Sequence, residues 1–512
     1  MGLKNIPETH VCTYFAQGIA PTVDWRNAAR VSIIILPDIA LLEIFDFYLG
    51  RIREEEEKLD AWLKLAHVCQ KWRYLVFGSP LRLGVRLWYK DYRPLEGQLD
   101  IWPSLPIAVW TDTEASKGSD YDVNNIIAAF DSEYNNRICT IGLWNFPGWQ
   151  MEQFLAAMHR PFPALTYLSL GLDVYEHMME SLESPLSVVS DSFLGGSAPL
   201  LEKLTLHYIP FPGLPKLLLS ATRLVKLDLT RIPHSVYLPP EVLVDCLSVL
   251  TKLEILNVGF DKFDGSLPSR VDQNSRSPSP LTRIHLPVLT ELWFKGASKY
   301  LEDIVARIDA PLLDTLRITF FHEPIIDTAQ LTQFIDRAPE LKTRDEARVV
   351  FYHREVSVAL PLPKTNNVPP LKLGISYKQT DLQLSSLARM CDSSFPQNFI
   401  PAVKLLDIIW NEDWHSEDSD GIETGEWLEL LRSFTAVKGL YISREAVSRS
   451  APALQELGER MTELLPSLDT LFLDEQTSGP VQESIAKFVS ARQLAGHPIS
   501  ISYESRIRYI LP

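Results

Sequence analysis

Paired cysteines are missing from this 512-residue sequence. No two of its cysteines are close enough to form a Cys-x-x-Cys pair; they are Cys12, Cys69, Cys139, Cys246 and Cys391. An odd number of isolated thiols indicates neither a disulfide framework nor a cysteine-based zinc site. Reduced thiols of an intracellular protein fit this pattern best.

Long apolar runs are missing as well. The N-terminus has no basic segment followed by an apolar stretch, and no run approaches the roughly 18 apolar residues of a membrane span. Ile6 stands where the myristoylation pattern needs Ser or Thr, and no Asn-x-Ser/Thr glycosylation sequon occurs. We therefore expect a cytoplasmic or nuclear protein that does not bind a membrane.

Positive charge is in deficit. The sequence has 49 Lys and Arg against 65 Asp and Glu, a formal net charge of −16. Such a field repels phosphate backbones, and no basic run interleaved with aromatic residues offsets it. We expect no nucleic-acid partner.

Catalytic and metal-binding motifs are also absent. The sequence contains no GxSxG, HExxH, P-loop or GxGxxG pattern, and its eleven histidines are not grouped with acids or cysteines at ligand spacing. An EF-hand loop with Gly421 at its sixth position would place Trp427 where the bidentate glutamate must stand. We expect no enzyme, no metal site and no cofactor, although a hydrolase site assembled from distant residues stays an alternative.

What the sequence does contain is a repeated Leu-x-x-Leu-x-Leu phrase. Clear copies begin at Leu165, Leu201, Leu224, Leu253, Leu289, Leu313 and Leu468, and weaker ones at Ile138, Val403 and Val437. The last two apolar positions alternate as in a strand, and a unit of one strand and one helix must stack on others to bury its apolar face. The phrase is unclear over residues 340–400, so we expect an interruption there.

The phrase resembles that of leucine-rich repeats over residues 131–512. The positions where that family carries an asparagine hold other residues. Two polar segments, near 261–284 and 411–426, are expected to be insertions between repeats.

Helical spacing marks the N-terminal part. Pro37 suits a first helical turn, and the apolar residues that follow recur at i, i+3 and i+4 until Gly50, a plausible stop. Residues 60–80 predict one further helix with an apolar stripe that includes Val68 and Trp72. A core this small is marginal below roughly 70 residues, so a partner or another domain should cover part of it.

The two halves of this region, LPDIALLEIF and HVCQKWRYLV, together resemble the F-box, here spanning roughly residues 34–80. The sequence departs from that family in the acidic insertion of residues 50–60 and in the residues after Pro80. It is most similar to the large F-box families of basidiomycete fungi. The resemblance implies a surface that docks on the Skp adaptor of an SCF-type cullin–RING ubiquitin ligase and that includes Leu36, Pro37, Ile39, Leu42, Ile44, Phe45, Val68, Cys69 and Trp72.

The predicted fold class is therefore α/β, with a short all-α F-box module followed by an irregular leucine-rich-repeat-like α/β solenoid. Residues 1–30 would be an N-terminal extension, 31–85 the F-box-like module, 86–130 a connecting segment and 131–512 the solenoid.

The predicted function is that of a non-catalytic subunit of a ubiquitin ligase, which recruits an unknown protein target through its repeats. The alternative is a repeat scaffold without ligase association, in which the F-box-like helices only cap the solenoid and bury the stripe around Trp72. Capture of a Skp adaptor would separate the two hypotheses.

The strand period predicts which side chains point away from the core to form the target-binding face. They include Lys203, His207, Asp228, Asn257, Trp293, Lys295 and Arg317. Trp293 lies between two charged outward positions, with Arg317 one strand away, which is the composition of an interaction hot spot.

Overall fold

The structure is a computed structural model in which the chain divides into two compact units, residues 1–87 and 88–512. It describes residues 36–52, 55–79, 82–83, 86–89, 105–110, 123–131, 133–172, 189–233, 238–260, 283–321, 326, 328–341, 344–352, 355–361, 370–376, 384–396, 399–410, 424–444, 446–447, 450, 456, 464–474 and 479–503. The expected N-terminal extension, residues 1–30, lies outside them.

The first unit contains three helices: α1 (Asp38–Gly50), α2 (Glu55–Ala66) and α3 (Gln70–Gly78). Helix α1 starts directly after Pro37, whose carbonyl accepts a hydrogen bond from the Leu41 N–H at 3.1 Å. Its buried face contains Leu41, Leu42, Phe45 and Leu49, at helical spacing. The predicted first helix is therefore present.

The predicted single helix over residues 60–80 is wrong, because the chain breaks into α2 and α3 around Cys69. The Cys69 backbone is extended, with φ −159° and ψ 171°. Its sulfur accepts a hydrogen bond from the Trp72 N–H at 3.5 Å, in the manner of an N-cap. A thiol is a weak cap, so the sequence pattern gave little sign of this helix start.

The second unit is built on a sheet that has 16 strands in the described part of the chain. Its order is β1-β2-β3-β4-β5-β6-β7-β9-β11-β14-β13-β12-β15-β16-β17-β18. The strands are β1 (Leu87–Tyr89), β2 (Ile107–Trp110), β3 (Ile138–Phe146), β4 (Tyr167–Leu172), β5 (Lys203–His207), β6 (Lys226–Ile232), β7 (Ile255–Phe260), β9 (Glu291–Gly296), β11 (Thr315–Phe321), β12 (Glu346–Tyr352), β13 (Glu355–Leu360), β14 (Leu371–Ser376), β15 (Leu405–Trp410), β16 (Gly439–Ile442), β17 (Thr470–Leu473) and β18 (Ser500–Tyr503). A second, two-stranded sheet pairs β8 (Ile284–His285) with β10 (Ile308–Asp309).

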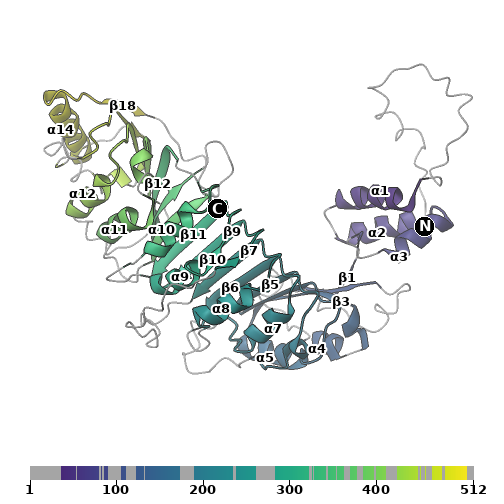
Figure 1. The fold of residues 1–512 in the computed structure, drawn as a ribbon. Coiled ribbons are helices and arrows are strands. Elements are labelled where there is room, and N and C mark those ends of the chain that lie inside the picture. Colours follow the sequence, from purple (N-terminus) through teal and green to yellow (C-terminus); the bar gives the residue numbers. More distant parts are fainter. Residues whose placement is uncertain are drawn as a thin grey trace, which may run out of the picture. The chain divides into compact units, whose positions relative to one another are not determined.

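Helices cover one face of the long sheet, and the opposite face, which we call the open face, carries none of the labelled helices (Figure 1). The helices are α4 (Val123–Asp131), α5 (Gly148–Ala157), α7 (Leu214–Ser220), α8 (Pro240–Leu247), α9 (Ser298–Val305), α10 (Ala329–Asp336), α11 (Leu384–Ser394), α12 (Thr424–Arg432) and α14 (Pro480–Leu494), with short 3-10 helices at η2 (Glu133–Arg137), η3 (Phe193–Gly196) and η5 (Ile400–Ala402). The unit is thus a mixed α/β solenoid with a large, mostly parallel sheet of leucine-rich-repeat type.

Each of the ten Leu-x-x-Leu-x-Leu phrases forms a strand of the long sheet, as predicted. In the copy at Leu201 the three leucines are all buried, Leu201 just before β5 and Leu204 and Leu206 within it. Because every copy repeats this pattern, the buried leucines of neighbouring strands stack into one continuous core beneath the helices.

A ladder of backbone hydrogen bonds links consecutive repeats just before their strands. The carbonyl of Glu202 accepts bonds from the N–H groups of Val225 (2.7 Å) and Lys226 (3.0 Å). The carbonyl of Val225 accepts in turn from Glu254 (2.8 Å) and Ile255 (3.1 Å). This main-chain ladder satisfies polar groups at the turn without the asparagine that the repeats lack.

The sheet begins earlier than the predicted boundary at residue 131. Strands β1 and β2 and all but the last residue of helix α4 lie in the segment 86–130, which was predicted to be a connection. β2 pairs in parallel with β3, and Ile107 and Val109 are buried in the common core. The Leu-x-x-Leu-x-Leu phrase is absent from β2, which is why the repeat search missed it.

The regular parallel order is interrupted between β11 and β15. The chain leaves β11 through α10, forms β12, turns back into the antiparallel β13, and then places β14 between β13 and β11. β14 is parallel to β11 and β12 is parallel to β15, so the repeat pattern resumes on both sides. This interruption coincides with the region where the phrase is unclear in the sequence.

The two predicted insertions lie mostly outside the described residues. β7 ends at Phe260 and β15 ends at Trp410, and residues 261–282 and 411–423 follow them. The end of the first segment belongs to the fold, because Ile284 pairs with Ile308 in the small sheet. The end of the second belongs to α12.

The cysteines of the described residues are all free; they are Cys69, Cys139, Cys246 and Cys391. Burial raises the pKa of the Cys246 thiol to about 11, and it raises that of Cys391 as well. A thiol with a raised pKa is a poor nucleophile and a poor metal ligand at neutral pH. These two cysteines therefore act as small core residues.

Among the described residues, none of the helices has both the length and the apolar composition needed to cross a lipid bilayer.

Helix α10 depends on a side chain from its neighbour α9. The Glu302 carboxylate accepts hydrogen bonds from the N–H groups of Gln330 and Leu331, both at 2.7 Å. It thereby satisfies two of the free donors at the start of α10 and places negative charge at the positive end of the helix dipole.

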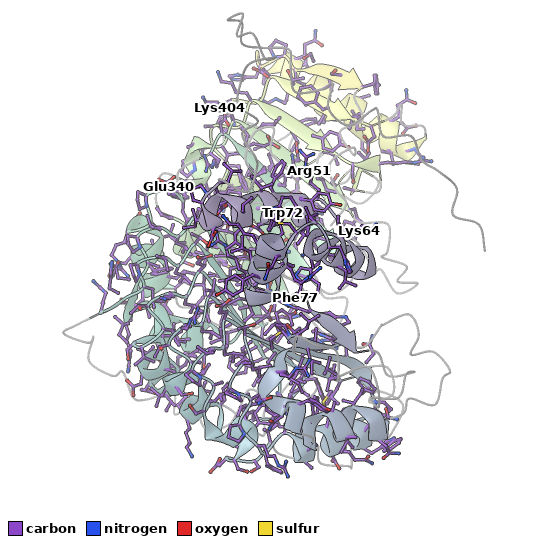
Figure 2. The ribbon with its side chains drawn as sticks, turned by 90° about the vertical axis from the view of Figure 1, so that its right-hand side faces the viewer. Arg51, Lys64, Trp72, Phe77, Glu340 and Lys404 are labelled. Atoms are coloured by element: carbon purple, nitrogen blue, oxygen red, sulfur yellow. The ribbon has the colours of Figure 1, made fainter. Side chains whose placement is uncertain are left out.

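We expect Glu302→Gln to lower the free energy of unfolding by about 1 to 3 kcal/mol, since a neutral amide makes weaker bonds and can offer only one oxygen. Urea unfolding and hydrogen exchange at the start of α10 measure the effect. The matched control is Glu340→Gln, because Glu340 is exposed beyond the end of α10 (Figure 2). Equal stability of both variants would show that the carboxylate does not cap the helix.

Candidate interaction surfaces

The nine predicted adaptor-binding residues divide into exposed, half-buried and buried side chains. Ile39, Ile44 and Val68 are 67%, 44% and 57% exposed, and Pro37 is exposed as well. Leu36, Cys69 and Trp72 are half-buried.

Leu42 and Phe45 are buried within the helical unit, so neither can touch a partner. The prediction that they form part of the docking surface is corrected to a supporting role. Both lie on the face of α1 that packs inward, and they hold the exposed residues of the same helix in position.

Trp72 lies among the three helices (Figure 2) and packs edge-on against Phe45, with ring centroids 4.6 Å apart. Its indole Nε1 is buried and has no hydrogen-bond partner among the residues that the structure describes. Trp72 is thus a core side chain of the helical unit with an unpaired buried donor.

Lys71 fixes the start of α1 to α3. Its Nζ donates to the Leu36 carbonyl at 2.9 Å and forms an ion pair with Asp38 at 3.1 Å. Asp38 is exposed and Lys71 half-buried, so the ion pair contributes little energy, but the hydrogen bond to the Leu36 carbonyl ties the start of α1 to α3. Residues from both halves of the sequence resemblance therefore meet in one place.

Sequence reasoning missed several exposed apolar side chains of this unit: Phe47 (64% exposed), Tyr48 (45%), Leu63 (39%) and Tyr74 (77%). Of the large apolar residues that are exposed in the described part of the chain, half belong to the helical unit. The sequence of α1 could have indicated this surface, because the helix carries apolar residues on its outer as well as its inner face. Surface of this kind marks a site where another molecule binds.

On the second unit, the predicted outward positions do lie on the open face. In β9, Leu292 and Phe294 are buried beneath the helices, while the side chains of Trp293 and Lys295 alternate with them and are half-buried. Strand register places Asn257, Trp293 and Arg317 side by side on β7, β9 and β11. The same register places Lys203 beside Lys226, His207 beside Thr230, and Asp228 beside Asn257.

Polar contacts join some of these side chains. Lys226 forms an ion pair with Asp228 at 3.3 Å, and Asp228 accepts a hydrogen bond from the Asn257 amide at 2.9 Å. His207 Nδ1 lies 2.9 Å from the Thr230 hydroxyl. Burial, together with the nearby Arg231, lowers the pKa of His207, so the imidazole is neutral at pH 7.

Other groups on the open face have no partner among the described residues. Lys203, Lys295 and Arg317 make no side-chain hydrogen bond or ion pair there, and the Arg317 Nε is buried. The Asn257 Oδ1 is also buried and unpaired, since only its amide nitrogen is engaged. Buried polar atoms without partners are rare in folded proteins, so this cluster is a candidate binding site.

Aromatic side chains cover the N-terminal part of the open face. Trp110 contacts Tyr167 with ring centroids 5.7 Å apart, and Trp144 contacts His207 at the same separation. The Trp144 ring lies flat over Gly171, where any Cβ atom would collide with it. Neither tryptophan lies in a clear copy of the repeat phrase, so the sequence pattern did not indicate them.

The C-terminal part of the open face carries its own ion pairs. Arg348 contacts Glu346 at 2.7 Å and Asp407 at 3.3 Å, and Lys372 contacts Glu355 at 2.7 Å. These charges already have partners, which leaves the stretch from β5 to β11 as the part with free cations.

Among the residues that the structure describes, no three His, Cys, Asp or Glu side chains come together at a spacing that could hold a metal ion.

Comparisons with known proteins give low similarity. No protein-family model and no curated protein matches the chain. Among solved structures, the chain is similar to the TLR13–ssRNA13 complex, with 12% identity and a TM-score of 0.26, over 72% of this chain and 45% of that one. It is also similar to the leucine-rich repeat-containing protein LegL7 from Legionella pneumophila, with 14% identity and a TM-score of 0.24, over 78% and 97% of the two chains.

The chain thus spans less than half the length of the first of these proteins. Because both TM-scores are low, the leucine-rich-repeat character of the second unit rests on its own strand order and register.

Proposed function

We propose that this chain is a substrate-recruiting subunit of an SCF-type cullin–RING ubiquitin ligase. In this proposal the helical unit binds a Skp-type adaptor, and the open face of the sheet binds the target protein. The chain itself carries out no reaction and needs no cofactor, because ubiquitin transfer falls to the other subunits.

The observation that carries the proposal is the exposed apolar surface of the helical unit. The resemblance to the F-box names Ile39, Ile44 and Val68 as adaptor-contacting positions, and each of them is between 44% and 67% exposed. An apolar surface of this density on three short helices is unfavourable in water unless another molecule covers it. An adaptor that contacts those positions would remove it from solvent.

A repeat scaffold without ligase association is the second candidate. It is favoured by the second unit alone, since a long solenoid with a free face serves protein binding in many settings. The two candidates differ in one measurable property, which is direct binding of the adaptor.

The test is a double substitution, Ile44→Asp with Val68→Asp, in the full chain. Both side chains are exposed, so the helices should stay folded, whereas two desolvated charges should weaken binding of a purified Skp-type adaptor at least a hundredfold. Isothermal titration calorimetry measures the affinity, and hydrogen exchange over residues 38–78 confirms the fold.

The matched control is Leu494→Asp, because Leu494 is an exposed apolar residue that belongs to the second unit. Its adaptor affinity should remain within about threefold of the wild type. A wild-type chain that fails to bind the adaptor would refute the ligase proposal and leave the scaffold. An equal loss in both variants would refute the predicted docking surface.

A further inference from the structure

The open face from β5 to β14 differs in charge from the rest of the protein. The whole chain carries 49 basic and 65 acidic residues, whereas the outward positions of these strands have more bases than acids. The bases are Lys203, Lys226, Lys295, Arg317 and Lys372, and the acids are Asp228 and Glu291. A basic strip on an acidic protein attracts acidic groups selectively to that strip.

Only some of these bases are free to bind a ligand. Lys226 is paired with Asp228, and Lys372 is paired with Glu355. Among the described residues, Lys203, Lys295 and Arg317 have neither an ion pair nor a side-chain hydrogen bond. These three are the charges that an acidic ligand would meet.

The centre of the strip is a row of three side chains on neighbouring strands. Asn257 offers a buried, unpaired acceptor, its Oδ1, and Arg317 offers a buried, unpaired donor, its Nε. Trp293 lies between them in register, and its ring leans over Gly259, where a Cβ atom would lie only 2.6 Å from it. The indole therefore forms a flat apolar platform between an acceptor and a donor.

A polypeptide is the ligand that matches this row. An apolar side chain can pack on the half-buried Trp293 ring, and a carboxylate can bind the terminal nitrogens of the Arg317 guanidinium. An isolated phosphate could use Arg317 but has no apolar group to cover the indole. We infer that the row of Asn257, Trp293 and Arg317 is the centre of a binding site for an extended, unmodified acidic segment of the target protein.

The spacing of the free cations sets the length of that segment. Lys203 and Arg317 are four strands apart in the sheet order, which at about 4.8 Å per strand is about 19 Å. An extended chain rises about 3.3 Å per residue, so about six residues span this distance. The segment should therefore carry acidic residues near both ends and an apolar residue between them.

This inference rests on the proposed function for its premise that the open face receives the target. The experiment uses the immobilised full chain and a random dodecapeptide library displayed on phage, with no adaptor present. We expect Asp and Glu to be enriched at least threefold at two or more positions of the selected peptides. A selected peptide, made synthetically with a fluorescent label, should bind the Arg317→Glu variant at least tenfold more weakly than the wild type.

The matched control is Lys216→Glu, which makes the same change in net charge on helix α7, on the other face of the sheet. Its affinity for the peptide should equal that of the wild type, because the charge lies outside the strip. Asn257→Asp supplies a second test, since a carboxylate at this position should repel the acidic segment and also weaken binding tenfold. Thermal unfolding checks that all three variants are folded.

Several results would overturn the inference. They are selected peptides without acidic enrichment, no selection at all, equal binding by Arg317→Glu and wild type, or an equal loss in Lys216→Glu. Adaptor affinity, measured separately on the same variants, should stay at the wild-type value. A chain that binds the acidic peptide but no adaptor refutes the proposed ligase role alone, and the reverse result refutes this inference alone.

Discussion

Phe45→Ala should unfold the helical unit while leaving the long sheet folded. Phe45 is fully buried, and its ring packs on the edge of Trp72 at 4.6 Å. Truncating a buried phenylalanine costs about 3 to 5 kcal/mol. A module of this size has a total stability of only about 3 to 5 kcal/mol, so the loss is of the same order as the whole.

Hydrogen exchange followed by mass spectrometry separates the two units. Peptides from α1, α2 and α3 should lose their protection in Phe45→Ala, while peptides from β9 and β11 should keep theirs, because they belong to a separate compact unit. Adaptor binding should be lost together with the protection.

Phe47→Ala is the matched control, since it removes the same side chain from the same helix. The Phe47 ring is 64% exposed, and an exposed cation, the Arg51 guanidinium, lies 4.3 Å from its centroid. Its loss should change stability by no more than about 0.5 kcal/mol. Full protection in Phe45→Ala, or equal loss in the two variants, would show that the helices do not pack around Phe45.

Phe294→Ala should destabilise the middle of the solenoid by about 3 to 5 kcal/mol. Phe294 is 1% exposed and stacks on Tyr300 of α9, with ring centroids 5.9 Å apart. Phe260 of β7 packs edge-on against it at 6.4 Å. Removing the ring would leave a cavity where strand and helix layers meet, and native-state hydrogen exchange of β7, β9 and β11 measures the cost.

The neighbouring residue provides the comparison. Trp293 has the larger ring but lies half-buried on the open face, so Trp293→Ala should cost less than about half as much. Equal losses would place Trp293 in the core and would contradict the assignment of this face to target binding.

The strands that the sequence predicted are those in which every repeat carries the same buried leucines. Leu204 and Leu206, for example, must point to one side, and that requirement also fixed the outward direction of Lys203. Periodicity of this kind is a local property, and local reasoning therefore found it.

The strands that the sequence did not predict depend on contacts between distant segments of the chain. Strands β12, β13 and β14 have no leucine phrase, and their order follows from pairing partners far along the chain, such as Leu316 with Leu371. The break between α2 and α3 is instead local, at Cys69, whose thiol accepts from the Trp72 N–H, and no periodic pattern reveals it.

In the candidate sites, too, the local strand and helix period was predictable, whereas the contacts between side chains were not. Alternation along β9 and β11 predicted that Trp293 and Arg317 face outward, and they do. Which charges remain unpaired could not be read from the sequence, because Lys226 and Lys372 find acids while Lys295 and Arg317 find none among the described residues. Likewise, helical spacing predicted apolar positions on α1 but not that Phe45 would be buried and Ile44 exposed.

The late arrival of β14 has a consequence for synthesis on the ribosome. The partner that closes the far edge of β11 is β14, yet β12 and β13 emerge first. Between Phe321 and Ser376 about 55 residues must be added, which at about 5 to 20 residues per second takes roughly 3 to 11 seconds. During that time the edge of β11 that β14 will occupy has no partner strand, although the strands before β11 are already synthesised. Two nascent chains on one messenger RNA can then pair through their β11 edges.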